Sequence, residues 1–221
     1  MKDLRIAIVS ANINDFDEHQ FNLPNGCKCD MHWYTEKNLP FPLVNLNSRL
    51  QGKYIKINTH RFLKNYDAYI WIDGSVEIKD KRFISQIIKK LEGEDVAISI
   101  HPERRNVYEE IEYILARIEE GKEYLVSRYA NEPLAEELVF YKNNHLPVEY
   151  PLYVCRFFAR WNNKRVNRIF DDWWNGCLEY SNFDQTMFSY ISWKHGLKIG
   201  ELDYNEIINN FVSVHKHKQK N

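Results

Sequence analysis

The sequence predicts an α/β protein with a mixed, mainly parallel β-sheet flanked by helices. Short apolar runs typical of strands alternate along the chain with longer segments in which apolar residues recur at helical spacing. Such alternation favours a parallel sheet whose strands are joined by helices. The 221 residues are 44% hydrophobic and show no internal repeat or linker, so we expect a single domain at residues 1–221.

The first apolar run, LRIAIVS at residues 4–10, ends in small and polar side chains. In an open α/β sheet, ligands bind outside the carboxyl ends of the strands. Ser10, Ala11 and Asn12 are therefore candidates for ligand contact. A second strand is predicted at residues 27–36. The two prolines within residues 38–47 predict a loop there.

The next apolar run leads into a polar turn in YDAYIWIDGSVEI, residues 66–78, which then resumes as a second short strand. An ionised carboxylate in an apolar setting is costly unless it is paired, hydrogen-bonded or bound to a metal, so Asp73 should have a partner. Gly74 would let a phosphate approach the backbone beside Asp73 and Ser75. The alternative is an ordinary tight turn, because Asp-Gly is common between two strands.

A strand, a helix and a strand follow one another between residues 66 and 101. Residues 81–93 have helical spacing and a stop at Gly93, and DVAISIH at residues 95–101 is a further buried strand. This order predicts a parallel pair joined by a right-handed crossover. Asp73 and His101 should then lie at the same edge of the sheet.

The remainder of the chain is predicted to be mostly helical. Residues 47–64 form a weakly helical stretch, on which basic residues make either a ligand-facing or an ordinary solvated face. Those residues are Arg49, Lys53, Lys56 and Arg61. Further helices are predicted at 107–122, 132–145, 164–178 and 184–194, with a strand at 152–160.

Two helix starts carry charged side chains. In HPERRNVYEE, residues 101–110, Arg104 and Arg105 offer forked donors to a phosphate or a sugar hydroxyl, whereas the alternative is a simple pair between Arg105 and Glu109 on one helix. Asp184 and Gln185 begin a later helix, where Asp184 would otherwise serve only as an N-cap.

Composition excludes several classes of function. A formal net charge of −1 argues against the positive field that nucleic-acid binding needs. No segment is apolar enough for a membrane span, and the start of the chain lacks a signal-peptide cleavage site, so we expect a cytoplasmic location. The four cysteines lack the spacing of a zinc site and are expected to be reduced and structural.

Trp173 and Trp174 invite two interpretations, because exposed indoles can stack on a sugar ring but tryptophans more often belong to a core. His215 and His217 alternate after a strand-like run near the end of the chain. Either histidine could reach a metal, and the competing interpretation is a disordered basic tail.

Four short blocks, in order, carry a family resemblance: WIDGSVEIKD, HPERRNVYEE, FDQTMFSYISWKHG and NFVSVHKHK. They resemble the glycosyltransferase-like domain of plant turgor-regulation and mucilage proteins and their bacterial relatives, over roughly residues 50–218. The resemblance implies a GT-A type, Rossmann-like fold. It places donor binding at about residues 1–105, the acceptor side at about 106–214 and a basic tail at 215–221.

The resemblance also implies roles for individual residues. A divalent metal, Mn²⁺ or Mg²⁺, would be held by Asp73 with His215 or His217. The expected catalytic residues are His101, Glu110, Asp184 and Gln185. Two positions depart from the pattern, because Ser75 replaces a second aspartate and Phe183 an arginine. Together with the strand-end residues, the donor-binding set is Ser10, Ala11, Asn12, Lys53, Arg61, Asp73, Gly74, Ser75 and Arg104.

The function implied is transfer of a sugar from a nucleotide-sugar donor to a glycan or polysaccharide acceptor, in surface polysaccharide assembly. Such transfer requires stabilisation of a diphosphate leaving group by a metal or arginines, and of an oxocarbenium-like sugar by a carboxylate. A lipid-linked acceptor would bring peripheral contact with a membrane. A catalytically silent nucleotide- or sugar-binding module and a metal-dependent phosphohydrolase or nuclease are the alternatives.

Overall fold

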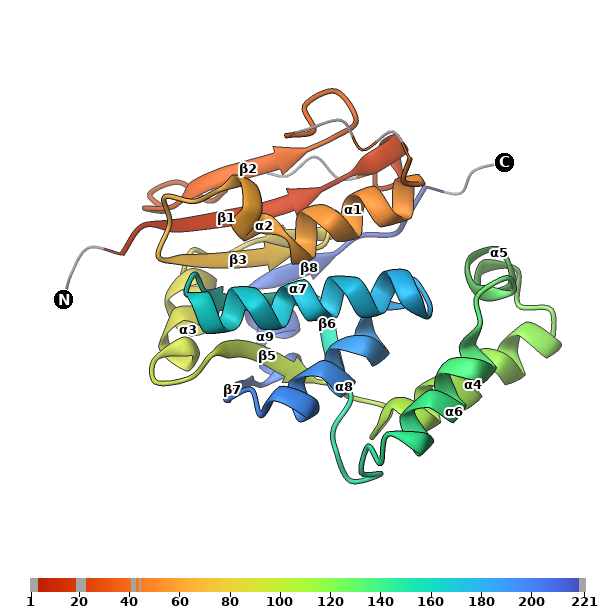
Figure 1. The fold of residues 1–221 in the computed structure, drawn as a ribbon. Coiled ribbons are helices and arrows are strands. Elements are labelled where there is room, and N and C mark those ends of the chain that lie inside the picture. The colour runs from red at the N-terminus through yellow and green to blue at the C-terminus, as the bar shows by residue number, and fades with distance from the viewer. Residues whose placement is uncertain (1–3, 19–22, 41–42, 44, 219–221) are drawn as a thin grey trace.

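The computed structural model describes residues 4–18, 23–40, 43 and 45–218, so parts of the predicted loop at 38–47 and of the tail lie outside the described residues. A six-stranded main sheet confirms the mixed, mainly parallel α/β fold (Figure 1). Its strands, in spatial order, are β2 (Asp30–Tyr34), β1 (Ile6–Ala11), β3 (Ala68–Ile72), β6 (Tyr153–Trp161), β5 (Val96–Ile100) and β7 (Ile199–Leu202). A second, two-stranded sheet pairs β4 (Val76–Ile78) with β8 (Val212–Val214).

Every strand of the main sheet except β6 runs in the same direction. β1 is parallel to both β2 and β3, whereas β6 is antiparallel to both β3 and β5. The expectation that β3 and β5 form a directly paired parallel unit was wrong, because β6, from later in the chain, is inserted between them. The two strands nevertheless point the same way, so Asp73 and His101 follow strand ends at one edge of the sheet.

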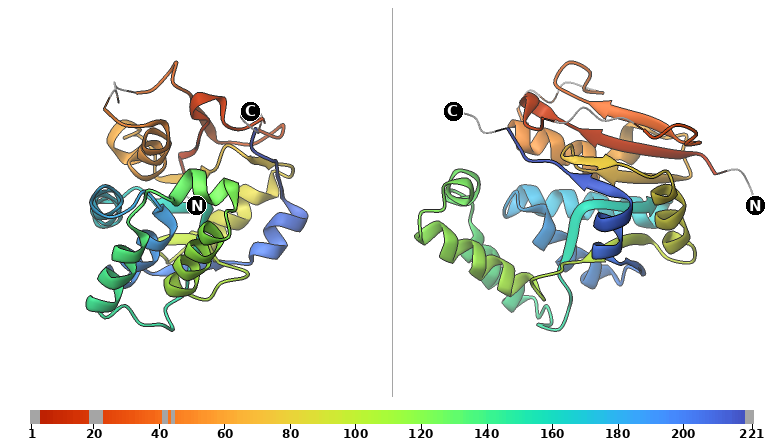
Figure 2. Two further views of the ribbon diagram at one scale, coloured as in Figure 1. Left: turned by 90° about the vertical axis from the view of Figure 1, so that its right-hand side faces the viewer. Right: turned by 180° about the vertical axis from the view of Figure 1, so that it is seen from behind.

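Helices cover both faces of the main sheet (Figures 1 and 2). One face packs against α1 (Ser48–Ile57), α7 (Lys164–Glu179) and α8 (Asp184–His195). The other face packs against α3 (Arg82–Leu91), α9 (Tyr204–Asn210) and the β4–β8 pair. Residues at four-residue spacing in α3, namely Phe83, Ile87 and Leu91, are fully buried, as the helical pattern predicts.

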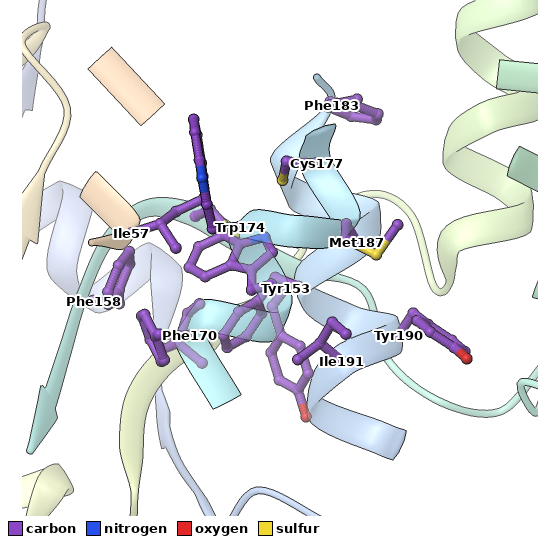
Figure 3. Packing of buried hydrophobic residues seen from close by; sticks show 14 of the residues in the cluster. Ile57, Tyr153, Phe158, Phe170, Trp174, Cys177, Phe183, Met187, Tyr190 and Ile191 are labelled. Carbon is purple, nitrogen blue, oxygen red and sulfur yellow. The ribbon is translucent and has the colours of Figure 1, made fainter. Parts of the chain in front are cut away.

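The largest core cluster lies between the sheet and the helices α7 and α8. Figure 3 shows Phe170 and Trp174 of α7 together with Met187 and Ile191 of α8 in this cluster. Trp173 is fully buried and its indole N–H donates a hydrogen bond to the carbonyl oxygen of Asp184, 2.9 Å away. The two tryptophans at 173 and 174 are therefore core residues and form no stacking surface for a sugar.

A helical extension projects from the carboxyl edge of the sheet (Figures 1 and 2). It consists of α4 (Val107–Glu119), α5 (Glu123–Tyr129) and α6 (Leu134–Asn143). The helix predicted at 107–122 stops earlier because Gly121 adopts a left-handed φ of 72°. The chain then turns, and α5 comes to lie beside the strand ends. The short α2 (Thr59–Phe62) follows α1 directly.

All four cysteines are free thiols, and Cys155 and Cys177 are buried. Within the described residues, no helix has both the length and the apolar composition needed to cross a membrane.

Candidate active site

A cleft with two connected lobes lies at the carboxyl edge of the main sheet. The first lobe, of about 310 Å³, is formed by the ends of β1 and β3, by α1 and α5, and by the C-terminal segment. The second lobe, of about 370 Å³, is formed by the β5–α4 loop, β6 and the start of α8. Each volume suits a small-molecule site. Six residues line both lobes: Lys53, Lys56, Asp73, Arg128, Arg156 and Asp184.

Asp73 occupies the boundary between the lobes and has the partners that its position requires. One carboxylate oxygen, Oδ1, accepts a hydrogen bond from the indole N–H of Trp71 at 2.7 Å and lies 3.5 Å from Nζ of Lys56. The Asp73 backbone N–H donates to the carbonyl of Arg156 at 2.8 Å. These contacts fix the carboxylate while leaving its side chain 38% exposed to the cleft.

Gly74 is required by close packing against neighbouring residues. A Cβ at this position would lie 2.8 Å from the carbonyl oxygen of Ala11 and would overlap the carboxylate of Asp17. The turn after β3 is closed by a hydrogen bond from the N–H of Val76 to the Asp73 carbonyl. It is a tight turn but not a hairpin, because β4 pairs with β8.

A buried ionic cluster joins α1 to α8. The carboxylate of Asp184 is bound by Nζ of Lys53 and by Nζ of Lys56, the latter at 2.8 Å. Burial alone would raise the pKa of Asp184, but the two ammonium groups outweigh it and hold that pKa well below its usual range. Asp184 therefore stays ionised at neutral pH. Its carboxylate does not cap α8, since the helix lacks a side-chain N-cap bond.

A bulge in β6 supplies cleft residues that the sequence did not predict. Ile98 of β5 is opposite Phe158 of β6, but the next residue, Ser99, is opposite Val154. The intervening β6 residues have no partner on β5, and two of them, Cys155 and Arg156, line the second lobe. Bulges commonly redirect side chains beside functional sites. The apolar run LYVCRFFAR carries no sequence signal for such a bulge.

The second lobe contains His101, Arg104 and Gln185. Behind them, the buried carboxylate of Glu110 pairs with Arg104, and its Oε1 accepts a hydrogen bond from the Gln185 amide at 3.3 Å. Burial, followed by the nearby guanidinium groups of Arg104 and Arg156, lowers the pKa of His101 to about 4. His101 is thus neutral at physiological pH. Glu110 holds its neighbours in place and does not line the cleft.

The C-terminal segment closes one side of the first lobe. His217 forms an isolated β-bridge with Asp17, and its Nδ1 lies 2.6 Å from the Asp17 carboxylate. Its ring contacts Phe16 and is parallel to that of Tyr124 in α5. Asp17 is itself fixed because its backbone N–H donates to Oδ1 of Asn12 at 2.9 Å. No pattern in the sequence pointed to Asp17 or to Tyr124.

Several predicted residues lie outside the cleft. Ser10 is buried in β1 and lines neither lobe. Arg61 lies in α2, beyond the end of α1, where the carboxylate of Asp171 binds its guanidinium. His215 is bound to Glu77 of β4 at 2.8 Å and does not line the first lobe, whereas His217 does. Of the other predicted residues, Ala11, Asn12, Lys53, Asp73, Gly74, Ser75, His101, Arg104, Asp184 and Gln185 line the cleft.

The cleft is positively charged although the whole chain has a formal charge of −1. Its acidic residues are outnumbered by basic ones, namely Arg49, Lys53, Lys56, Arg104, Arg128 and Arg156. Arg105, by contrast, pairs with Glu109 on the surface, as the simpler interpretation predicted. Such a concentration of cations around strand ends favours a negatively charged ligand over a neutral or positively charged one.

A divalent metal would find only part of its coordination shell here. Among the described residues, no three histidine, cysteine, aspartate or glutamate side chains gather into a preformed metal site. Asp73 and His217, however, line the same lobe. With Nδ1 of His217 engaged by Asp17, Nε2 is the nitrogen left for a ligand, an arrangement typical of metal-binding histidines. The donor set fits a metal that takes its remaining ligands from a bound diphosphate.

A solved glycosyltransferase structure shares this fold. The apo structure of the bifunctional glycosyltransferase WbbM matches with a TM-score of 0.51 at 10% identity, covering 90% of this chain and 39% of that one. Lower scores come from a glycosyltransferase involved in glycosylation of the major capsid of PBCV-1 (0.46, 11% identity, 90% and 82% covered) and from mouse xyloside xylosyltransferase 1 (0.44, 12%, 90% and 85%). At these identities the WbbM likeness shows a GT-A fold alone, and this chain spans about two fifths of WbbM.

No curated protein sequence matches the chain. Residues 35–217 match the profile described as TOD1/MUCI70, glycosyltransferase-like domain. The match covers most of the chain and includes both lobes of the cleft except for the end of β1 and the residues just after it. The chain therefore belongs to the TOD1/MUCI70 glycosyltransferase-like domain family.

Proposed function

We propose that this protein is a glycosyltransferase that moves a sugar from a nucleotide-sugar donor to a glycan acceptor in surface polysaccharide assembly. The first lobe takes the nucleotide and the second lobe the acceptor, so the diphosphate lies at their boundary beside Asp73. One observation carries the proposal: the basic residues shared by the lobes, Lys53, Lys56, Arg128 and Arg156, converge on that boundary. Fixed cations there would stabilise the charge that develops on a diphosphate leaving group.

Asp184 serves in this proposal to hold the two lysines in place. Its pKa lies well below the usual range because Lys53 and Lys56 outweigh the effect of burial, so it is a poor acceptor for a proton at neutral pH. The ion pair fixes both ammonium groups at the boundary between the lobes. Part of the electrostatic stabilisation is then in place before the donor binds.

Asp73 and His217 are the residues that would hold a divalent cation, Mn²⁺ or Mg²⁺. Such an ion would neutralise the diphosphate and act as a Lewis acid on its oxygens. Asp17 keeps the imidazole of His217 oriented through Nδ1. Ser75 cannot supply the carboxylate that many related folds have at this position, so the lysines and arginines share the role.

The test is release of nucleoside diphosphate from a panel of nucleotide sugars, with and without Mn²⁺, alongside calorimetric titration of the nucleoside diphosphates. We expect at least one diphosphate to bind and its sugar conjugate to be turned over. Absence of binding by every nucleotide would contradict the proposal. Binding without turnover on any acceptor would instead favour a silent nucleotide-binding module, the alternative suggested by Ser75.

A further inference from the structure

Hydrogen-bond donors surround both ring nitrogens of His101, although a neutral imidazole can accept at only one of them. The backbone N–H groups of Glu103 and Arg104 both donate to Nδ1, at 3.1 and 3.0 Å. Nη2 of Arg104 lies 2.8 Å from the other ring nitrogen, Nε2. A neutral imidazole has only one acceptor nitrogen, and a guanidinium has no lone pair to offer. One of the two ring nitrogens therefore carries a hydrogen and cannot accept from the donor beside it.

Backbone geometry decides which nitrogen that is. The two N–H groups belong to the turn that leads from β5 into α4, and the chain is fixed there because the His101 N–H donates to the carbonyl of Leu152 at 2.8 Å. Nδ1 must consequently hold the lone pair, and Nε2 carries the hydrogen. The low pKa of His101, about 4, rules out a second proton at neutral pH. The N–H group on Nε2 and an N–H group of Arg104 are then neighbours, and neither accepts a hydrogen bond from the other.

Arg156 adds a second guanidinium to the same place. It projects from the β6 bulge into the second lobe, which His101 also lines. Within the described residues its side chain makes a single hydrogen bond, to the hydroxyl of Tyr204 at 2.7 Å, and no ion pair. Most of its N–H donors are available to a ligand.

We propose that the second lobe binds an anionic group of the acceptor, a carboxylate or a phosphate, between Nε2 of His101 and the guanidinium groups of Arg104 and Arg156. One anionic oxygen beside Nε2 of His101 and Nη2 of Arg104, which are 2.8 Å apart, accepts from both N–H groups, and it balances the charge of Arg156. Glu110 binds Arg104 from behind and Glu103 binds its Nη1 at 2.9 Å, which leaves Nη2 for this role. That the anion belongs to an acceptor rests on the proposed function. Binding of the anion itself can be tested without turnover.

The experiment is a titration of the isotopically labelled full-length protein, followed by NMR, with three probes: methyl glucuronide, methyl glucoside and inorganic phosphate. We expect the glucuronide to bind at least about tenfold more tightly than the glucoside, because a charge-assisted pair of hydrogen bonds is lost with the carboxylate. Preference for the glucuronide identifies an acidic sugar, and preference for phosphate identifies a phosphorylated acceptor. Equal binding of glucuronide and glucoside, with no binding of phosphate, would overturn the proposal.

Variants test the residues of this site, and a competitor separates the site from the diphosphate site. Arg156→Gln and Arg104→Gln should each weaken the anion about tenfold while leaving the glucoside unchanged. Arg156→Gln leaves the buried Glu110 paired, so it remains informative if Arg104→Gln folds poorly. Arg105→Gln is the matched control, because Arg105 is paired with Glu109 outside the cleft.

The titrations are repeated with saturating UDP, and UDP binding is measured in the same samples. Displacement of the glucuronide by UDP would place the anion in the diphosphate site and overturn the inference. Failure of UDP and of every other nucleoside diphosphate to bind would count against the proposed function alone.

Discussion

The two lobes of the cleft are built from different kinds of structure. The first lobe lies where the parallel strands β1 and β3 end, and it is completed by the C-terminal segment. The second lobe depends on a strand that runs the opposite way, β6, and on an irregularity within it. The first is thus a product of regular α/β topology, whereas the second is a local addition to that topology.

This difference has a functional meaning in the proposed reaction. Nucleotides bind at strand ends in many open α/β sheets, so regular topology suffices for the donor side. An acceptor must be recognised by side chains placed individually. The bulge in β6 achieves such placement by directing Arg156 into the cleft between β3 and β5.

The largest expected effect is at the boundary between the lobes. Asp73→Asn keeps the size of the side chain and its bond from Trp71 but removes the charge that Lys56 and a metal would face. We expect the protein to fold and turnover to fall by about 10²-fold or more, as for loss of a fixed electrostatic group. The measurement is nucleotide-sugar turnover together with a thermal melt.

Asp80→Asn is the matched control for Asp73→Asn, since Asp80 precedes the helix α3 and binds Arg82 away from the cleft. Turnover in this control should stay at the wild-type level. If Asp73→Asn also retained full turnover, the boundary would not be the site of chemistry.

A second prediction concerns the buried cluster that supports both lobes. Asp184→Asn leaves Lys53 and Lys56 buried without their carboxylate, and we expect a loss of about 3–5 kcal/mol of unfolding free energy. Because the folded-state pKa of Asp184 is lowered, its contribution is present above the unfolded pKa of about 4 and is lost as pH falls below it. Denaturant melts from pH 6 to pH 3 should show the difference from wild type narrowing below about pH 4.

The double variant Lys53→Met/Asp184→Asn should recover part of this stability, because one uncompensated charge has been removed with its partner. If the difference in unfolding free energy between wild type and Asp184→Asn were the same at every pH, the stabilising effect of Asp184 would not depend on its ionisation.

The sequence was informative where periodicity and strand ends determine position. It placed Ala11, Asn12, Asp73 and His101 at one edge because parallel strands bring their carboxyl ends together. It did not predict the insertion of β6 between β3 and β5, because an apolar run does not state the direction of a strand. Asp17 was missed because its contact with the C-terminal segment depends on tertiary packing, and Arg156 was missed because the bulge does too. The spacing of basic residues at 47–64 could not show where the helix ends.

A third prediction separates the lobes by their ligands. His217→Ala should weaken binding of a nucleoside diphosphate in the presence of Mn²⁺ by about tenfold, because a ligand of the first lobe is lost. His215→Ala is the matched control, since His215 binds Glu77 outside the lobe, and it should leave the affinity unchanged. Calorimetry provides both values. If the two substitutions lowered the affinity equally, His217 would have no specific role as a ligand.

The smallest effect is expected at Arg61, which the sequence favoured as a donor-binding residue. The structure places it at the end of α2, bound to Asp171 and with 43% of its side chain exposed. An exposed ion pair contributes less than about 1 kcal/mol, so Arg61→Gln should lower the unfolding free energy by no more than that. Nucleotide affinity should stay within about twofold of wild type. Lys56→Gln on the adjoining helix should lower it further, because Lys56 lines both lobes. Comparable losses of affinity in the two variants would extend the donor site beyond the first lobe to the surface around α2.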